Sequence, residues 1–528
     1  MVTIRFEMVS AAIQRAEALE DPNIQNSLEK GHEFRQRIVL ADKLLTKDEK
    51  SLALKVLVGG LDIIKIYSNE GKKRICENCQ NECLATSYCE HCIKNYLKEN
   101  FSNWTSGNDD VDNLIQQCQM KTLSPHRIAE WIPFSNLQNI KYLTKGGCSE
   151  IYTAVRIDGS YIEWDSKKKQ LIKFGQFKVV LKKLENVESV NKSWFEEGIS
   201  HLHLSSRSGF IVGCHGLTQD PLNGNYMLVL NRMDINLREY LNQNHNKLTW
   251  KERIQIVHFI VKAIFFIHKE NAIHRDLHSG NILFNRDNQG FYISDLGFCG
   301  PANIPLNSIY GNLSYIAPEV IVNKKYTFAS DIYSIGMLMW EISSGQPPFI
   351  NKHDYDLAIK IVNGMRPKIV PGTPLEYKEL MVQCWDANIT KRPNIEFLYN
   401  KISNIYRLYS QNENYGQVVN TCNSQLNSNF SVSSSSTNNS FFENFSLSSS
   451  NWNFSSRVYS FENLPEPRNA TEEEQEVYHS IQYDFDLQDN LIIVEGKSNK
   501  RICFNDDEKD LIATSNKKVK SNNNEETQ

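Results

Sequence analysis

The chain carries little net charge and has no long hydrophobic run. Its 58 lysine and arginine residues nearly balance 62 aspartate and glutamate residues, which gives a formal net charge of -4 over 528 residues. This balance excludes binding to nucleic acid or to a membrane surface through bulk charge. The most apolar stretch, residues 254–268, contains His258 and Lys262 and is too short to span a bilayer, so we expect a buried helix there. Function must therefore lie in local sites.

Cysteine is scarce for so long a chain and is unevenly placed. The 12 cysteines are too few for a disulfide framework, and residues 1–20 lack the uninterrupted apolar core of a secretory signal. We expect a reducing location in the cytoplasm, with the nucleus as the alternative, and no membrane partner. The length of 528 residues predicts two or three structural units.

Changes in composition divide the chain into five regions. Residues 1–70 carry apolar residues at helical spacing and predict a small helical module, whereas residues 71–100 are rich in cysteine. Residues 101–135 are polar and are interpreted as a linker, and residues 136–406 have the dense apolar patterning of a large domain. Residues 407–528 are rich in asparagine and serine. They cannot bury enough apolar surface to offset the entropy of ordering, which predicts a mostly disordered tail.

The cysteine-rich region has the spacing of a zinc site. Two Cys-x-x-Cys pairs lie nine residues apart: Cys76 and Cys79, then Cys89 and Cys92. A hairpin between the pairs would bring four thiolates around one tetrahedral Zn²⁺ in a structural role. Cys83 and His91 are further candidates, so spacing alone leaves the choice of four ligands open, with the two pairs the simplest choice.

A glycine turn near the start of the large domain suits the binding of nucleotide phosphates. It lies in the run Lys145-Gly-Gly-Cys-Ser-Glu-Ile-Tyr152. Because glycine has no side chain, Gly146 and Gly147 would let backbone amides approach phosphate oxygens closely. An ordinary glycine turn is the alternative interpretation.

A lysine on the next apolar strand suits the same ligand. Residues 179–183 predict a strand on which Lys182 is placed to hold the α- and β-phosphates, while a surface lysine is the alternative. A carboxylate must orient this lysine. We choose Glu197 in the helical segment at residues 194–201, with Glu196 as the alternative.

The most informative segment is Ile273-His-Arg-Asp-Leu-His-Ser-Gly-Asn281. It resembles the catalytic loop of eukaryotic protein kinases, and a chance polar loop is the alternative. The resemblance implies that Asp276 accepts the proton of the substrate hydroxyl and that Asn281 binds Mg²⁺. Phosphoryl transfer needs alignment and charge neutralisation more than covalent chemistry, and these two side chains supply both.

Further motifs follow in the order and spacing of that family. Asp295-Leu-Gly297 is similar to the metal-binding triplet and makes Asp295 an Mg²⁺ ligand. Tyr315–Glu319, Ser330–Gly336 and Lys391–Pro393 resemble the end of the activation segment, the buried central helix and the late arginine motif. In this family Glu319 and Arg392 would form a buried ion pair.

The resemblance implies an α+β fold of two lobes, with a β-rich N-lobe at residues 136–232 and a mainly helical C-lobe at residues 233–406. It implies ATP and Mg²⁺ as cofactors and protein substrates as partners, with no nucleic-acid partner expected. The nucleotide-binding set is Gly146, Gly147, Ile151, Lys182, Glu197, Asn231 and Met233.

Departures from the family pattern bear on specificity. Thr144 and Ser149 stand where glycines are usual, and His278 replaces a lysine, as in the tyrosine kinase-like branch. Serine/threonine specificity is preferred, with dual specificity as the alternative. Arg275 is a candidate to bind a phosphate on the activation segment, where Ser308 and Tyr310 are the possible acceptors.

Two readings compete with an active kinase. One is an ATP-binding pseudokinase scaffold, which the presence of Lys182, Asp276, Asn281 and Asp295 disfavours. The other is a zinc-knuckle protein that binds nucleic acid, which the few basic residues near the cysteines disfavour. The order of helical start, cysteine pairs and kinase domain resembles a lineage-expanded set of fungal kinases.

Overall fold

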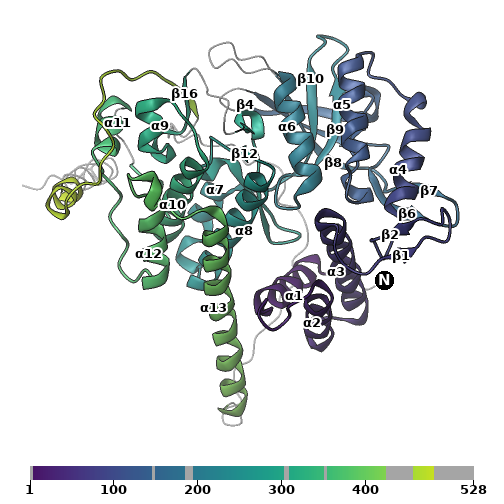
Figure 1. The fold of residues 1–528 in the computed structure, drawn as a ribbon, viewed down its shortest axis with the longest axis horizontal. Helices are drawn as coiled ribbons and strands as arrows, with labels where there is room; N and C mark the ends of the chain where they lie inside the picture. The colour runs from purple at the N-terminus through teal and green to yellow at the C-terminus, as the bar shows by residue number, and fades with distance from the viewer. Residues whose placement is uncertain are drawn as a thin grey trace, which may run out of the picture. The chain divides into compact units, whose positions relative to one another are not determined.

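The computed structural model describes residues 4–145, 149–184, 194–301, 308–349, 354–423 and 456–480 (Figure 1). The chain divides into two compact units, residues 1–470 and residues 471–528. The described part of the second unit is a helix at residues 472–480.

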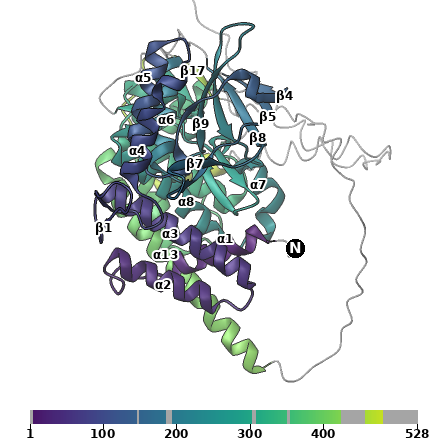
Figure 2. The same cartoon turned by 90° about the vertical axis from the view of Figure 1, so that its right-hand side faces the viewer.

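Three helices form the N-terminal module: α1 (Phe6–Leu19), α2 (Leu28–Ala41) and α3 (Lys47–Ser68) (Figure 2). Small apolar side chains such as Ala12, Ala16 and Ala53 fill their common core. A capping box starts α3, because Thr46 accepts from the Glu49 amide at 3.3 Å and Glu49 accepts from the Thr46 amide at 2.9 Å. The expected helical module is therefore present.

Cysteine-rich residues follow as two short strands and a helix: β1 (Arg74–Ile75), β2 (Glu82–Cys83) and α4 (Glu90–Glu99). Residues 101–135 differ from the expected linker, since they form α5 (Asp109–Met120) and β3 (Glu130–Trp131). Val111 and Ile115 of α5 are fully buried, and Asn108 caps its start. The polar residues that suggested a linker are the exposed face and cap of this helix.

The N-lobe contains a six-stranded sheet in the order β3-β9-β10-β8-β5-β4. Its other strands are β4 (Leu137–Lys145), β5 (Glu150–Arg156), β8 (Phe177–Lys183), β9 (Cys214–Gln219) and β10 (Tyr226–Asn231). Neighbouring strands are antiparallel except β3 and β9. Helix α6 (Trp194–Arg207) packs on the sheet, and β6 (Tyr161–Asp165) and β7 (Gln170–Lys173) form a separate hairpin. The sheet thus begins at residue 130, before the expected domain start at 136.

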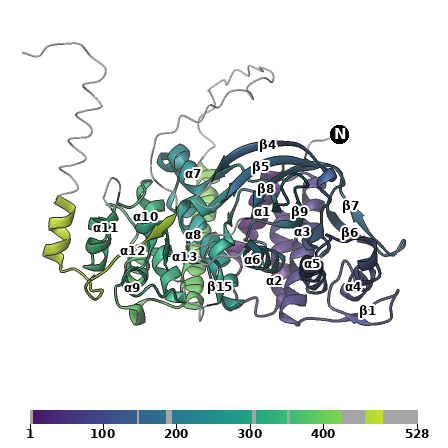
Figure 3. The same cartoon turned by 90° about the horizontal axis from the view of Figure 1, so that it is seen from above.

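The C-lobe is mainly helical (Figure 3). Its helices are α7 (Leu237–Asn244), α8 (Trp250–Lys269), α9 (Pro318–Asn323), α10 (Phe328–Ser344), α11 (Asp354–Val362), α12 (Leu375–Cys384) and α13 (Ile395–Asn423). The buried helix expected at residues 254–268 is the central part of α8. Among the residues that the structure describes, no helix combines the length and apolarity needed to cross a membrane.

After β10, the described residues also form seven short strands. They are β11 (Ile235–Asn236), β12 (Ala272–Ile273), β13 (Ile282–Asn285), β14 (Gly290–Ile293), β15 (Gly300–Pro301), β16 (Ile309–Gly311) and β17 (Arg457–Tyr459). Strands β13 and β14 form a hairpin, and β12 pairs with β15. The catalytic-loop sequence therefore lies between two small strand pairs that hold both of its ends.

Among the residues that the structure describes, the tail departs from the expectation of disorder in three places. Helix α13 continues past residue 406 to Asn423, residues 456–470 pack on the C-lobe, where β17 pairs with β16, and residues 472–480 form a helix. The yellow-green segment in Figure 1 follows α11 toward β16. Arg-Val-Tyr at 457–459 supplies β-branched and aromatic residues that favour a strand. The averaged composition of the tail concealed this short segment.

Candidate active site

Lys182 is held in the middle of the N-lobe sheet. Strand β8 pairs on both sides, so Lys182 lies opposite Ile151 of β5 and Leu228 of β10. Its Nζ is 2.7 Å from Oε1 of Glu197 on α6. Glu197 is buried, with 1% of its surface exposed, whereas Glu196 is exposed. The structure therefore selects Glu197 as the carboxylate that orients Lys182.

The same ammonium group also reaches the C-lobe. Lys182 Nζ is 2.6 Å from Oδ1 of Asp295. Asp295 lies two residues after the end of β14 and adopts a left-handed backbone with φ of 54°. Burial disfavours the charge of Lys182, but the carboxylates of Asp295 and Glu197 outweigh it, so the pKa of Lys182 lies above its ordinary value. Lys182 is thus a permanent cation at the junction of the lobes.

Asp331 of α10 holds the backbone of the loop that carries Asp276. Asp331 accepts hydrogen bonds from the backbone amides of His274 at 2.8 Å and Arg275 at 3.0 Å, and from His268 Nε2 at 2.9 Å. Burial opposes the charge of Asp331, but the His268 hydrogen bond and nearby groups outweigh it, so its pKa is lowered. Sequence reasoning missed Asp331. Its signal was its place in the motif Ser330–Gly336, for which the sequence predicts a buried helix but no role for the carboxylate.

Asn281 lies between Asp276 and Asp295. Its Nδ2 donates to the backbone carbonyl of Asp276 at 2.9 Å, and its own carbonyl accepts from the Ser294 amide at 2.8 Å. The β13–β14 hairpin, with Ile282 opposite Ile293, brings residues 281 and 295 together. Because its amide nitrogen is engaged with Asp276, Asn281 would hold a metal ion through its amide oxygen, together with the carboxylate of Asp295. Oxygen donors of this kind fit Mg²⁺.

The remaining nucleotide-binding candidates are Gly146, Gly147, Ile151, Asn231 and Met233. Gly146 and Gly147 lie outside the described residues. Ile151 is half-buried on β5, and Met233 packs against the apolar cluster that contains Leu228 and Leu230. Asn231 ends β10, and its Oδ1 is 2.7 Å from His215 Nε2. Ile151 and Lys182 lie directly opposite one another.

The predicted pair of Glu319 and Arg392 is confirmed. Arg392 donates from Nη1 and Nη2 to the two carboxylate oxygens of Glu319, both at 2.7 Å, and its side chain is fully buried. A two-point contact of this kind fixes both position and orientation. It anchors the start of α9 to the loop before α13, 73 residues later in the chain.

His278 and Tyr310 lie close to the catalytic loop. Nε2 of His278 is 3.7 Å from Oδ1 of Asp276, and burial lowers the pKa of His278, which favours its neutral form. Tyr310 is buried and stacks on Phe298 with 3.6 Å between ring centroids. A phosphate on Tyr310 would therefore require this ring to leave its packing.

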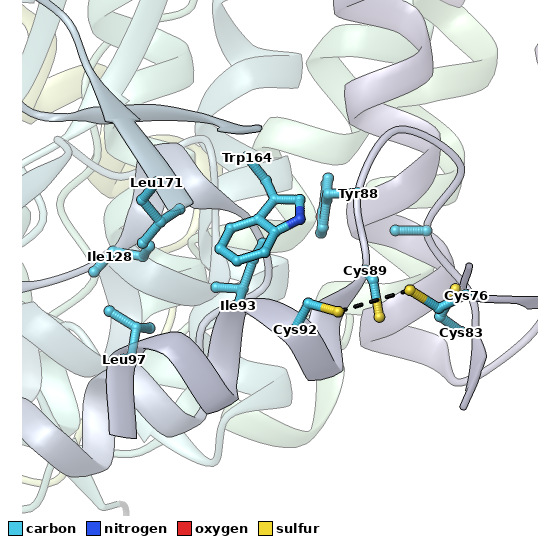
Figure 4. Close-up of a cluster of buried hydrophobic side chains, with 11 residues drawn as sticks. Cys76, Cys83, Tyr88, Cys89, Cys92, Ile93, Leu97, Ile128, Trp164 and Leu171 are labelled. Atoms are coloured by element: carbon cyan, nitrogen blue, oxygen red, sulfur yellow. Dashed lines mark hydrogen bonds between the residues drawn. The ribbon is translucent and has the colours of Figure 1, made fainter. Parts of the chain in front are cut away.

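The four paired cysteines lie together, with their sulfur atoms within 4.8 Å of one another, and Figure 4 shows three of them, Cys76, Cys89 and Cys92. Cys76 Sγ is 3.6 Å from Cys92 Sγ, and Cys79 Sγ is 3.7 Å from Cys89 Sγ. Four thiolates about 2.3 Å from a tetrahedral Zn²⁺ would lie about 3.8 Å apart. Cys83 instead groups with Cys89 and Glu90, and His91 is exposed. The geometry therefore fits Zn²⁺ and selects the two Cys-x-x-Cys pairs.

Local hydrogen bonds preorganise this cluster. Asp62 of α3 accepts from the Thr86 amide at 2.6 Å and the Ser87 amide at 2.9 Å, just before the second cysteine pair. Glu90 accepts from the Leu84 amide at 2.8 Å. Trp164 and Leu171 of the β6–β7 hairpin belong to the same buried cluster as the cysteines (Figure 4). The cluster thus connects the N-terminal module to the N-lobe.

Comparison with known proteins agrees with this geometry. Residues 137–402 match the family described as protein tyrosine and serine/threonine kinase. Because this match spans just over half of the chain, the chain belongs to that family. The fold, with its six-stranded sheet and helical C-lobe, is that of a bilobal kinase.

Three relatives illustrate the similarity. A dual specificity protein kinase of Dictyostelium discoideum is 30% identical over 204 residues, which is 35% of this chain and 26% of the relative. A dual serine/threonine and tyrosine protein kinase of Homo sapiens is 30% identical over 231 residues, covering 42% of this chain and 24% of the relative. A protein of Acanthamoeba polyphaga mimivirus named as a serine/threonine-protein kinase/receptor is 30% identical over 274 residues, covering 49% and 16%. The chain therefore spans about a quarter or less of these relatives.

Proposed function

We propose that this chain is an active protein kinase that transfers the γ-phosphate of ATP to protein hydroxyls. The observation that carries the proposal is the ammonium of Lys182, held 2.7 Å from Glu197 of the N-lobe and 2.6 Å from Asp295 of the C-lobe. Three elements distant in the chain converge on this one cation. A pseudokinase scaffold would need none of Asp276, Asn281 and Asp295 beside it.

Each side chain has a defined task. Lys182 binds the α- and β-phosphates, and the ion pair with Glu197 holds the Lys182 ammonium in the orientation that this binding needs. Asp276 accepts the proton of the attacking hydroxyl, while Asp331 holds the backbone on which Asp276 is mounted. Asn281 and Asp295 would hold Mg²⁺, which bridges phosphate oxygens and neutralises their charge when bound.

The substrates are proteins, with serine and threonine preferred and dual specificity as the alternative. Support comes from relatives whose names describe serine/threonine and dual specificity kinases. His278, in place of the usual lysine, supports an assignment to the tyrosine kinase-like branch. The cysteine module before the kinase domain supports kinship with the lineage-expanded fungal set.

The cysteine cluster holds a structural Zn²⁺ in this proposal. Two Sγ–Sγ contacts of 3.6 and 3.7 Å, one buried and one partly buried, support it, because they match the spacing of four thiolates around one tetrahedral Zn²⁺. The cysteines within the described part of the chain form no disulfide, which also fits the reducing cytoplasm as the location, with the nucleus as the alternative.

Purified full-length protein given Mg-ATP and a generic protein substrate tests the kinase proposal. We expect phosphate transfer by the wild type and by the Asp287→Asn variant, since Asp287 is exposed in the turn between β13 and β14. The same substitution at Asp276 should abolish transfer. ATP binding without transfer by the wild type would instead identify a pseudokinase, and equal transfer by both variants would exclude Asp276 as the catalytic base.

A further inference from the structure

A segment of the tail lies directly on the catalytic loop. Strand β17 pairs antiparallel with β16, placing Tyr459 opposite Ile309 and Arg457 opposite Gly311. Strand β16 belongs to the activation segment, and the Cβ position of Gly311 is 3.2 Å from Oδ1 of Asp276. Extended peptides commonly bind a protein by adding a strand in this way. The pairing therefore delivers the residue that precedes β17 to Asp276.

That residue is a serine. Oγ of Ser456 donates to Oδ1 of Asp276 at 2.7 Å and lies 3.1 Å from Nε2 of His278. Only 9% of the Ser456 surface is exposed. Nδ1 of His278 accepts from the Gly280 amide at 3.1 Å, so in the neutral ring Nε2 carries the proton and donates to Ser456. The hydroxyl thus occupies the position of a phosphoacceptor, with its proton directed at the catalytic base.

Contacts beyond Ser456 hold the segment along α11. Arg457 forms an ion pair with Asp354 at 3.1 Å, and the Tyr459 ring stacks on Phe461 with 5.6 Å between centroids. Phe461 also contacts Tyr355, with 6.2 Å between centroids. These contacts follow one another along the chain. The segment is therefore bound as an ordered peptide over several residues.

The far end of the segment is fixed as well. The Arg468 amide donates to the Val362 carbonyl at 3.0 Å, and Oδ1 of Asn469 accepts from the Ala387 amide at 2.9 Å. Gly364 has a φ of +93°, and a Cβ there would lie 2.1 Å from the Ala470 nitrogen. Glycine at this position permits the close approach. Residues 456–470 are thus held at both ends.

We infer that Ser456 is an intramolecular phosphoacceptor, modified by the kinase domain of its own chain. This inference rests on the proposed function. Asp276 takes the Oγ proton as Oγ bonds to the γ-phosphorus of ATP, the bond from that phosphorus to the β–γ bridging oxygen breaks, and ADP leaves with the electron pair. The phosphoserine then carries close to two negative charges beside Asp276, and repulsion drives the segment away. Transfer to Ser456 thereby frees the surface for other protein substrates.

Time-resolved phosphosite mapping of full-length protein with Mg-ATP tests the inference. We expect phosphate at Ser456 with a first-order rate constant that does not change with protein concentration. Ser460 is exposed four positions later and serves as the matched control. Ser456→Ala should remove this first-order phase, whereas Ser460→Ala should leave it unchanged.

Mixing wild-type protein with a distinguishable Asp276→Asn chain separates the two routes of transfer. Phosphate on Ser456 of the wild-type chain alone supports the inference, and phosphate on Ser456 of the inactive chain at the same rate overturns it. An added protein substrate monitors general activity in the same tube. Transfer to that substrate with no phosphate at Ser456 overturns the inference and leaves the proposed function standing, whereas no transfer at all overturns both.

A charge exchange tests whether the observed docking delivers Ser456. Arg457→Glu should slow the first-order phase about two- to fivefold, because exposed ion pairs contribute little energy. Adding Asp354→Arg to this variant should restore the rate. Failure of both variants to change the rate would show that the segment reacts from another bound position.

Discussion

The cysteine cluster and the phosphotransfer centre assemble in opposite ways. The four thiols come from residues 76–92, and hydrogen bonds to Glu90 and to Asp62 of α3 hold the backbone between the two pairs. The phosphotransfer centre collects Lys182, Glu197 and Asp295 from two lobes, and the hydrogen bond between Lys182 and Asp295 spans 113 residues of chain. Local spacing is enough for the first site. The second exists only when both lobes are folded and packed.

This contrast predicts that the cysteine cluster can be destroyed while the kinase domain survives. Cys89→Ser removes one of four ligands, so we expect the variant to lose its zinc. The module should then unfold, because structural Zn²⁺ contributes about 10 kcal/mol or more to the folding of such modules. Metal analysis and hydrogen exchange should show loss of zinc and of protection at residues 74–99, with ATP binding retained. Cys83→Ser is the control and should keep the metal. Absence of zinc from the wild-type protein would contradict the zinc assignment.

At the phosphotransfer centre, catalysis can be removed without unfolding the kinase domain or the cysteine cluster. Asp276→Asn should lower phosphate transfer about a thousandfold, because an amide cannot accept the proton of the hydroxyl. ATP affinity and the melting temperature should change little, since Asp331 still holds the loop backbone. Single-turnover assays and thermal shifts with ATP would measure both. A large fall in thermal stability would show that the carboxylate is structural.

The long-range assembly should also be sensitive to the Glu319–Arg392 anchor. Arg392→Met leaves the largely buried Glu319 carboxylate without its two donors and should lower the free energy of unfolding by about 3 kcal/mol. Urea unfolding would measure this loss. The exposed pair of Lys269 and Glu396, 3.5 Å apart, provides the control, because Lys269→Met should have a small effect. Equal effects of the two variants would count against the anchor.

The smallest effect is expected where the two regions meet, at the base of the β6–β7 hairpin. Asp158 contacts Arg156 at 2.8 Å and Lys173 at 2.9 Å. Burial would raise its pKa, but these two cations lower it to about 2. A carboxyl whose folded pKa lies below its unfolded value stabilises the fold above the unfolded pKa near 3.9, and this stabilisation is lost as pH falls toward 2.

Allowing for solvent screening, this loss should be about 1 kcal/mol between pH 5 and pH 2. Between pH 5 and pH 2, the free energy of unfolding should fall less steeply with decreasing pH in Asp158→Asn than in the wild type. Identical pH profiles would show that Asp158 is not coupled to the cations in solution.

Several elements could be predicted because their signals are local. The cysteine pairs, the helix at residues 254–268 and the loop with Asp276 and Asn281 all follow from residues close together in the chain. The choice between Glu196 and Glu197 was different, since one residue of helical register rotates a side chain by about 100°. Helix α5 was missed for a different reason, because its polar cap and exposed face resemble the composition of a linker.

By itself, the sequence determined which chemical groups this protein has and their local order: paired thiols, a catalytic-loop aspartate and asparagine, and an aspartate that follows a strand. Only the tertiary structure decided which of them meet, that Asp331 supports the loop, and that Ser456 reaches Asp276 from 180 residues away. The physical reason is that a contact between distant residues depends on the packing of every element between them. No spacing rule within one segment contains that information.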